Sequence, residues 1–305
     1  MAGAPSSIPT HLEPSKLGTK EYWDNLYTTE LTNHSHDPSD KGTVWFDDSD
    51  AETKVLEFLE DLAEEASSPS SYPASPTSTD HEESQQTQQQ PQPQTKQPQQ
   101  QQQPPQLDKE TTSFLDLGCG NGSFLFALRA EGWQGPCLGV DYSERSVALA
   151  RQIAASEGQQ DEVPVGFDVW DVLRGPYGTV LETKETTTST TTTTEDDKSS
   201  NGDGWDVVHD KGTFDAISLS EEADEAGRRI CEGYKGRVVR LVRPGGFFLV
   251  TSCNWTEEEL EGWFGEGSAE VEGGSFVRVG RVNYPSFSFG GVKGQTISTV
   301  CYQRR

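Results

Sequence analysis

The chain has 305 residues, and 50 acidic against 24 basic side chains give it a formal net charge of −26, while only 31% of its residues are hydrophobic. Such a composition is typical of a chain that is partly disordered rather than packed throughout. The negative charge disfavours a nucleic-acid partner, because phosphate recognition requires a basic surface. A basic protein or a small molecule is the more natural partner.

The chain shows no membrane, export or metal signal. No apolar run approaches the roughly 18 residues that a membrane span requires, and residues 1–10 lack the charged start and apolar core of a secretory signal. The five cysteines are scattered, odd in number and without a CxxC pair, which favours neither zinc nor a disulfide framework. We therefore expect a cytoplasmic protein, with the nucleus as the alternative, without metal and without membrane attachment.

Two segments have little to bury. Residues 85–106 contain 14 Gln and 5 Pro, and residues 186–194 are Thr at every position except Ser189. Such tracts cannot offset the entropy lost on ordering. We expect a disordered insertion over 66–110, a second over 182–203, and a folded core over 111–305 around the second one. The low-complexity parts, 66–106 and 182–203, carry net charges of only −2 and −4, so most of the acidity belongs to the fold.

Beyond the first insertion, short apolar runs alternate with helical patterns, which is typical of a parallel sheet with helices on both faces. The predicted strands are 113–117, 137–141, 163–169, 205–209 and 247–251, and the predicted helices are 123–131, 143–157 with Ser143 as N-cap, and 228–242. Two more strands near 275–282 and 296–302 are expected to close the sheet as an antiparallel hairpin. The predicted fold is α/β, a Rossmann-like, doubly wound sheet of seven strands.

A glycine-rich turn follows the first predicted strand and opens a helix. Glycines there let the backbone approach a ligand closely, because no Cβ intervenes and positive φ is allowed. They are equally consistent with a tight loop. The turn reads Asp116-Leu-Gly118-Cys-Gly120-Asn121-Gly122-Ser.

Acidic residues follow the next two predicted strands. Ligands of open α/β sheets bind beyond the carboxyl ends of the strands. Asp141, after the second strand, can accept two hydrogen bonds from a ribose diol, and Asp171, after the third, can reach an adenine amino group. Asp141 could instead cap the helix that starts at Ser143. The joint placement of these acids and the glycines favours a nucleoside site.

The glycine spacing is G-x-G-x-G rather than the G-x-G-x-x-G of dinucleotide-binding folds. With Asp116 two residues ahead of the first glycine, this D-x-G-x-G-x-G turn resembles the class I methyltransferases that use S-adenosylmethionine. The resemblance implies S-adenosylmethionine as cofactor, with Asp116 or its neighbours at the methionine ammonium and Asp141 at the ribose. The other residues that we assign to the cofactor are Gly118, Gly120, Asn121, Gly122, Tyr142, Asp171 and Trp23.

Five further segments resemble the protein-lysine methyltransferases that act on translation elongation factor 1-alpha, in the elongation factor methyltransferase 4 branch. The segments are LGTKEYWDNLY at 17–27, VWF at 44–46, DKGTFDAIS at 210–218, TSCNWT at 251–256 and FSFGG at 287–291. The resemblance implies a monomeric enzyme that mono- or dimethylates a lysine of that factor, with residues 1–65 covering cofactor and substrate. It also implies a role in intracellular transport, which no residue supports. One departure is Asp47, where the family pattern leads us to expect glycine.

The sequence does not decide which group contacts the substrate amine. Segment 210–213 lacks the Asn/Asp-Pro-Pro-aromatic motif of nucleobase methyltransferases. We predict that Asp210 orients the amine, with Trp23, Tyr27 and Trp255 as aromatic walls and Asn254 beside them. Equally, Asp210 could cap the helix near Thr213, and the aromatic residues could belong to the core. A methyltransferase for a small metabolite and a non-catalytic S-adenosylmethionine-binding module are the alternative functions.

Overall fold

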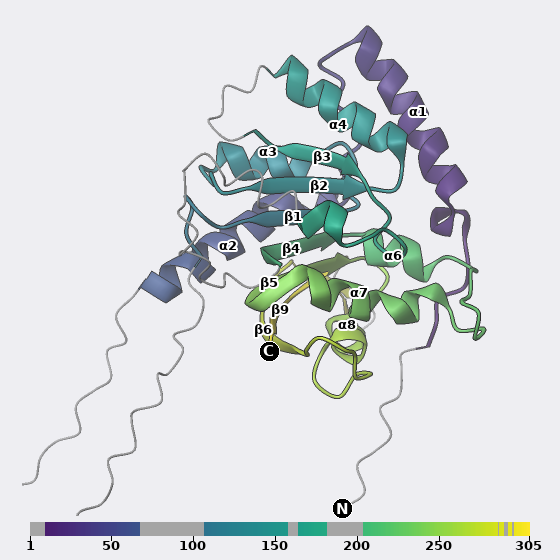
Figure 1. The fold of residues 1–305 in the computed structure, drawn as a ribbon, viewed down its shortest axis with the longest axis vertical. Helices are drawn as coiled ribbons and strands as arrows, with labels where there is room; N and C mark the ends of the chain where they lie inside the picture. Colours follow the sequence, from purple (N-terminus) through teal and green to yellow (C-terminus); the bar gives the residue numbers. More distant parts are fainter. Residues whose placement is uncertain are drawn as a thin grey trace, which may run out of the picture.

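The computed structural model describes residues 10–67, 107–157, 164–181, 204–285, 287–289, 292–294 and 296–305. Within them, seven strands form one sheet in the order β3-β2-β1-β4-β5-β9-β6 (Figure 1), and β7 pairs separately with β8. Neighbouring strands from β3 to β5 are parallel, whereas β9 is antiparallel to both β5 and β6. This confirms the predicted Rossmann-like sheet with its antiparallel end. The strands are β1 Phe114–Leu117, β2 Cys137–Asp141, β3 Gly166–Val169, β4 Trp205–Lys211, β5 Val242–Ser252, β6 Phe276–Val282, β7 Phe287–Phe289, β8 Val292–Gly294 and β9 Ser298–Arg304.

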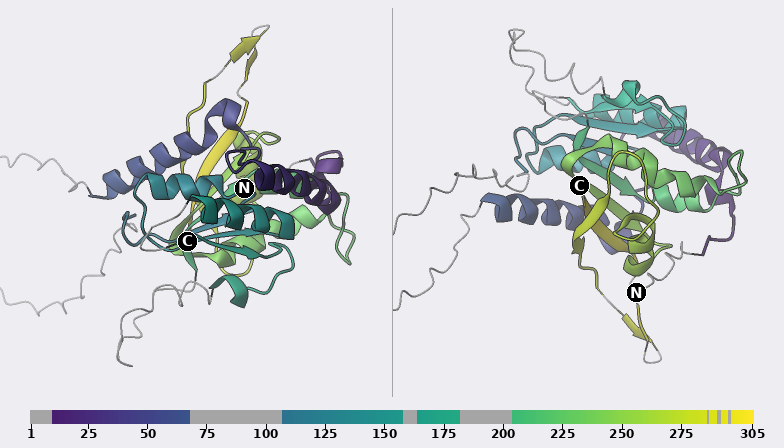
Figure 2. Two further views of the ribbon diagram at one scale, coloured as in Figure 1. Left: turned by 90° about the horizontal axis from the view of Figure 1, so that it is seen from above. Right: turned by 60° about the horizontal axis from the view of Figure 1, so that its bottom comes forward.

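Helices cover both faces of the sheet (Figure 2). Side chains alternate between the faces of a strand, so Leu115 of β1 belongs to the core cluster that includes residues of α6, α7 and α8, while Phe114 belongs to the cluster that includes residues of α2, α3 and α4. Helix α1 lies against α4, where Tyr27 contacts Leu149. The helices are α1 Lys20–His36, α2 Ala51–Ser67, α3 Ser123–Ala130, α4 Glu144–Ser156, α6 Thr213–Ser218, α7 Tyr234–Leu241 and α8 Glu257–Phe264, with 3-10 turns η1 Lys16–Gly18, η2 Asp47–Ser49 and η3 Ile230–Gly233.

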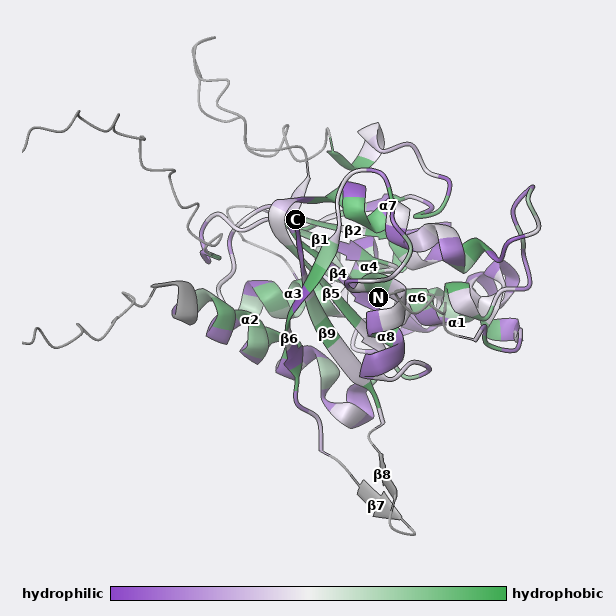
Figure 3. Ribbon diagram, turned by 90° about the horizontal axis from the view of Figure 1, so that it is seen from below, coloured by the Kyte–Doolittle hydropathy of each residue, from purple (hydrophilic) through white to green (hydrophobic). Residues whose placement is uncertain are grey.

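The helices follow from amphipathic patterns and caps. In α2, Val55 and Leu59 are buried while Glu57 is exposed, and Figure 3 shows hydrophobic and hydrophilic residues alternating along this helix. Ser143 caps α4, as predicted, by accepting a hydrogen bond from the amide of Ser146. These local signals are strong in the sequence and account for the correct helix positions.

Several predicted boundaries are wrong, among them the following three. The fold resumes at residue 107 rather than 111, because Leu107 is buried and Asp108 accepts the amides of Glu110 and Thr111. The helix predicted at 228–242 begins only at η3, since Arg229 pairs in a β-bridge with Ala223. Strand β5 starts at Val242 instead of 247, because Val242 pairs with Trp205 through a register shift. The structure does not describe some residues of the predicted insertions and of the predicted third strand. These residues are 68–106, 163 and 182–203.

The described part of the chain contains no helix that is both long and apolar enough to cross a membrane. In the same residues, no three His, Cys, Asp or Glu side chains are grouped so that they could hold a metal ion. All five cysteines are free, four of them buried and Cys253 exposed.

Candidate active site

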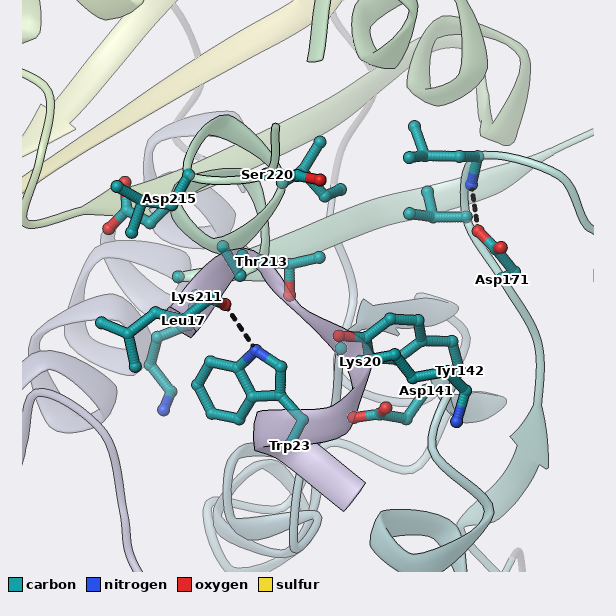
Figure 4. A pocket seen from close by; sticks show the side chains of 18 of the residues that line it. Leu17, Lys20, Trp23, Asp141, Tyr142, Asp171, Lys211, Thr213, Asp215 and Ser220 are labelled. Carbon is teal, nitrogen blue, oxygen red and sulfur yellow. Dashed lines mark hydrogen bonds between the residues drawn. The ribbon is translucent and has the colours of Figure 1, made fainter. Parts of the chain in front are cut away.

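A cavity of about 400 Å³ lies beyond the carboxyl ends of β1, β2, β3 and β4. Its walls come from the glycine turn, the ends of β2 and β3, helix α6, the turn after β5, and the N-terminal segment that includes η1 and α1. Figure 4 shows Asp141, Tyr142 and Lys20 on one side of Trp23, with Leu17 and Lys211 on the other. We call the part of the cavity near Asp141, Tyr142 and Lys20 the first arm, and the part near Leu17 and Lys211 the second arm.

The glycine turn requires its glycines, but for different reasons. Gly118, Gly120 and Gly122 have φ values of 67°, 57° and 83°. A Cβ on Gly118 would lie 2.0 Å from the Thr213 hydroxyl oxygen, which itself donates to the Leu117 carbonyl at 2.7 Å. Gly118 lines the cavity, whereas Gly122 does not and instead leaves room for the ring of Phe167.

Gly120 lies at the junction with helix α1, where a Cβ would come within 2.8 Å of the Tyr27 hydroxyl. Tyr27 lines the cavity and is buried. Burial and the nearby Asp141 raise the pKa of its hydroxyl well above the usual value. Tyr27 therefore enters the site as a neutral hydroxyl.

Asp141 ends β2 and lines the first arm. Its carboxylate accepts hydrogen bonds from the amide of Gly120, the amide of Ser143 and the hydroxyl of Ser146, at 3.3, 2.8 and 2.9 Å. Burial raises its pKa to about 6, against the opposing effect of these donors. Asp141 therefore stabilises the start of α4 through Ser143 and Ser146, which agrees with the alternative that it caps this helix. It also lines the cavity.

Tyr142 and Asp171 complete the first arm, and both line the cavity. The Lys20 ammonium lies 5.2 Å from the centre of the Tyr142 ring. Asp171 accepts the amides of Leu173 and Arg174 at 2.8 and 3.3 Å, which fixes the turn after β3. Acceptors and an aromatic ring are therefore held along this arm by the backbone around them.

Asp116 and Asn121 line a neighbouring cavity of about 30 Å³ rather than the large one. Asp116 pairs with Nδ1 of His209 at 2.8 Å, and both side chains are buried. The Asn121 amide donates to the carbonyl oxygen of Lys41 at 2.9 Å, which ties the segment before α2 to the glycine turn. The two cavities share Gly118, Tyr27, Trp45 and Lys211.

The N-terminal segment supplies an aromatic wall. Trp23 lines the cavity, and its indole N–H donates to the Leu17 carbonyl at 2.8 Å. Its ring lies 5.3 Å from that of Trp45, which with Phe46 also lines the cavity. The left-handed φ of 65° falls on Phe46, so Asp47 needs no glycine-like conformation. The VWF segment was the only signal for Trp45 and Phe46 in the sequence.

The prediction that Asp210 meets the substrate amine is wrong in this structure. Asp210 is fully buried and does not line the cavity. Its carboxylate accepts the amides of Thr213 and Phe214 at the start of α6 and the hydroxyl of Tyr234. Burial raises its pKa to about 7. The helix-cap alternative is the one that these contacts confirm.

Of the two residues predicted after β5, Asn254 lines the cavity and Trp255 does not. Trp255 is buried in the core beside Phe214 and Trp263, and its indole N–H donates to the Ser218 hydroxyl at 3.3 Å. Its prediction as a substrate wall is wrong, because the turn after β5 directs the indole inward. The cavity residues that the predictions missed include Lys20, Trp45, Phe46, Lys211, Asp215 and Cys253.

A glycine turn at positive φ, an acid ending β2 and an antiparallel β9 between β5 and β6 define a class I methyltransferase domain. The methyltransferase domain family matches residues 108–275. Protein-lysine N-methyltransferase EFM4 of Saccharomyces cerevisiae is 33% identical over 96% of this chain and 97% of its own length. Its Schizosaccharomyces pombe counterpart is 33% identical over 96% and 95%, and EEF1A lysine methyltransferase 2 of Danio rerio is 30% identical over 95% and 89%.

The chain belongs to the family of S-adenosylmethionine-dependent protein-lysine N-methyltransferases. S-adenosylmethionine is its cofactor. The residues of the first arm fit this group, because Gly118 lines the cavity with backbone that carries no Cβ and Asp141 lines it from the end of β2.

Proposed function

We propose that this enzyme methylates a lysine of translation elongation factor 1-alpha, to the mono- or dimethyl level, as a cytoplasmic monomer, with the nucleus as the alternative location. The identity of 33% along nearly the whole of a protein-lysine methyltransferase carries the proposal. The named animal relatives are EEF1A lysine methyltransferases. We also propose that the enzyme acts without nucleic acid and without a membrane.

The first arm is suited to hold the cofactor. Asp141 would bind the ribose hydroxyls, with the glycine turn below and Tyr142 and Asp171 along the arm. When bound, S-adenosylmethionine supplies an electrophilic methyl group on a positively charged sulfur. Asp116 and Asn121 line the neighbouring cavity and hold the glycine turn in place. Asp116 pairs with His209, and the Asn121 amide donates to the Lys41 carbonyl. Proximity and orientation of the two reactants can then supply much of the rate.

The second arm suits the substrate. Trp23, Trp45 and Phe46 form apolar walls along which the methylene stem of a lysine can pack. The chain's net charge of −26 favours approach of a basic protein. Asn254 is exposed and lines the cavity, and in this proposal it contacts the substrate backbone.

A methyltransferase for a small metabolite and a non-catalytic binding module are the alternatives. Neither explains the length over which the chain matches protein-lysine methyltransferases. A role in intracellular transport has no support from the described residues or from the names of the relatives, and it forms no part of the proposal.

The test is incubation of the full chain with methyl-labelled S-adenosylmethionine and a lysate of cells that lack the enzyme, followed by mass spectrometry. We expect labelled mono- or dimethyl-lysine in elongation factor 1-alpha. Label in the lysine of another protein would overturn the proposed substrate, and label confined to small molecules or nucleic acid would overturn the proposed reaction. Recombinant elongation factor 1-alpha as sole substrate provides the positive control.

A further inference from the structure

Asp215 is a buried acid that lines the cavity near the second arm, and the cofactor residues of the first arm leave it without a role. Asp215 belongs to α6, is 5% exposed, and lines the cavity together with Cys253 and Asn254 from the turn after β5. The side chains of Cys253 and Asn254 are exposed. Figure 4 shows Asp215 on the same side of Trp23 as Leu17 and Lys211.

We propose that Asp215 is the catalytic residue that receives the amino group of the substrate lysine. The inference rests on the proposed reaction, lysine methylation, and not on which protein carries the lysine. Asp215 was not among the site residues predicted from the sequence, although it lies only five residues after Asp210.

The contacts of the two acids separate their roles. Asp210 uses its carboxylate on two helix amides and the Tyr234 hydroxyl, away from the cavity. Asp215 accepts the hydroxyl of Ser252 and the amide of Cys253, the latter at 2.8 Å. The Cys253 thiol and the Asn254 amide also act on this carboxylate, so the turn after β5 holds Asp215 in place at the wall of the cavity.

The surroundings match a lysine side chain. Lysine is an apolar stem ending in a cation, and the walls of Trp45 and Phe46 lead along the cavity that Asp215 lines. Lys211 is a cation of the second arm, but its ammonium already has partners. It donates to the Trp45 carbonyl at 3.0 Å and lies 3.4 Å from the carboxylate of Glu52. The carboxylate of Asp215 thus provides the negative charge for an incoming ammonium.

In the proposed step, the lysine ammonium first passes one proton to the carboxylate of Asp215. The freed nitrogen lone pair then forms the new bond to the methyl carbon. The bond from that carbon to sulfur breaks, and its electron pair remains on sulfur. Burial raises the pKa of Asp215 above its usual range, against the opposing hydrogen bonds from Ser252 and Cys253, which makes it a better proton acceptor than an exposed aspartate.

The test compares wild type, Asp215→Asn and Ser252→Ala. Ser252→Ala removes one bond to Asp215 and two bonds to the turn, from the amides of Asn254 and Trp255, but keeps the carboxylate. We expect Asp215→Asn to lower the rate of methyl-lysine formation about 100-fold, with affinity for S-adenosylhomocysteine within about twofold of wild type. Ser252→Ala should stay within about fivefold of the wild-type rate.

Two further readouts exclude a purely structural role. The residual rate of Asp215→Asn should rise about tenfold per pH unit from pH 7 to 9, because the amine must then lose its proton to water. With S-adenosylhomocysteine bound, a peptide carrying the methylated lysine should bind wild type more tightly than its norleucine analogue, and this preference should vanish in Asp215→Asn. The norleucine comparison on wild type alone keeps the test decisive if the variant does not fold.

Full activity of Asp215→Asn would overturn the inference, as would equal losses in Asp215→Asn and Ser252→Ala, or no preference of wild type for lysine over norleucine. If wild type labels lysine in a protein other than elongation factor 1-alpha, the proposed substrate fails, and the three comparisons are made on that protein. If wild type labels no lysine, both the proposed reaction and the role of Asp215 are overturned.

Discussion

The two sides of the cavity are built by different means. On the β1–β2 side, the backbone shapes the site: Gly118 and Gly120 adopt positive φ, and Asp141 is held by the amides and the hydroxyl around it. On the β4–β5 side, side chains shape it: Asp210 turns inward to cap α6, and Asp215 turns toward the cavity. Backbone requirements restrict which residue types can occur, so the first side is readable in a sequence and the second is much less so.

The largest effect is expected at Gly118, where the two sides meet. In Gly118→Ala, a Cβ would lie 2.0 Å from the Thr213 hydroxyl oxygen at a φ of 67°. We expect the free energy of unfolding to fall by about 4 kcal/mol, from overpacking and left-handed strain together, and cofactor affinity to fall with it. Denaturant unfolding and calorimetric titration with S-adenosylhomocysteine measure both.

Gly132→Ala is the matched control for that substitution. Gly132 also has positive φ, 85°, but an added Cβ would meet nothing within 4 Å. We expect a loss of about 1 kcal/mol and unchanged cofactor affinity. Equal effects of the two substitutions would mean that the Gly118–Thr213 contact does not join the two sides of the cavity.

The next effect is expected at Asp210. Asp210→Ala leaves the amides of Thr213 and Phe214 and the hydroxyl of Tyr234 without their acceptor. We expect the free energy of unfolding to fall by about 3 kcal/mol in Asp210→Ala. In Tyr234→Phe it should fall by about 1 kcal/mol. Thermal and denaturant unfolding provide the comparison. A stable but inactive Asp210→Ala enzyme would return Asp210 to a catalytic role.

Asp210 also predicts a pH dependence. Burial raises its pKa from 3.8 to about 7, so between pH 4 and pH 7 the folded state keeps a proton that the unfolded state has lost. Its contribution to stability is complete below about pH 4 and is lost as the pH rises through 7. Urea unfolding at pH 5 and pH 7 should show a smaller decline for Asp210→Asn than for wild type. Identical declines would contradict the assignment.

The smallest effect is expected at Trp255. Trp255→Phe removes the donor to Ser218 but keeps an aromatic ring in the core. We expect a loss of about 1 kcal/mol in stability and no change in KM for the protein substrate. Because Trp45 lines the cavity, Trp45→Phe should raise KM several-fold, about 1 kcal/mol of binding. A raised KM in Trp255→Phe would place that ring back in the substrate arm.

Sequence patterns predicted the strands, the glycine turn and the acid at the end of β2 on the backbone-built side. The alternation of strands and helices, the glycine turn and Asp141 each follow from local rules of periodicity, positive φ and placement at a strand end. The same rules placed Tyr142 and Asp171 on the cavity. They could not separate Gly118, which lines it, from Gly122, whose missing Cβ accommodates Phe167 from β3.

The side-chain-built side was harder to predict, because each choice depends on distant contacts. Asp210 and Asp215 lie in one segment, and only the position of Tyr234 and Ser252 shows which acid turns inward. Trp45 reaches the cavity because the segment before α2 is held by Asn121 through the Lys41 carbonyl, 80 residues away. Trp255 follows Asn254 directly, yet the two point in opposite directions.

The division of the cavity into a cofactor side and a substrate side is tested most directly by calorimetric titration of S-adenosylhomocysteine into Asp141→Ala and Asp215→Asn. We predict that Asp141→Ala weakens binding about 30-fold, the loss of charged hydrogen bonds, while Asp215→Asn binds within about twofold of wild type. Equal weakening in both variants, or weakening in Asp215→Asn alone, would contradict the division.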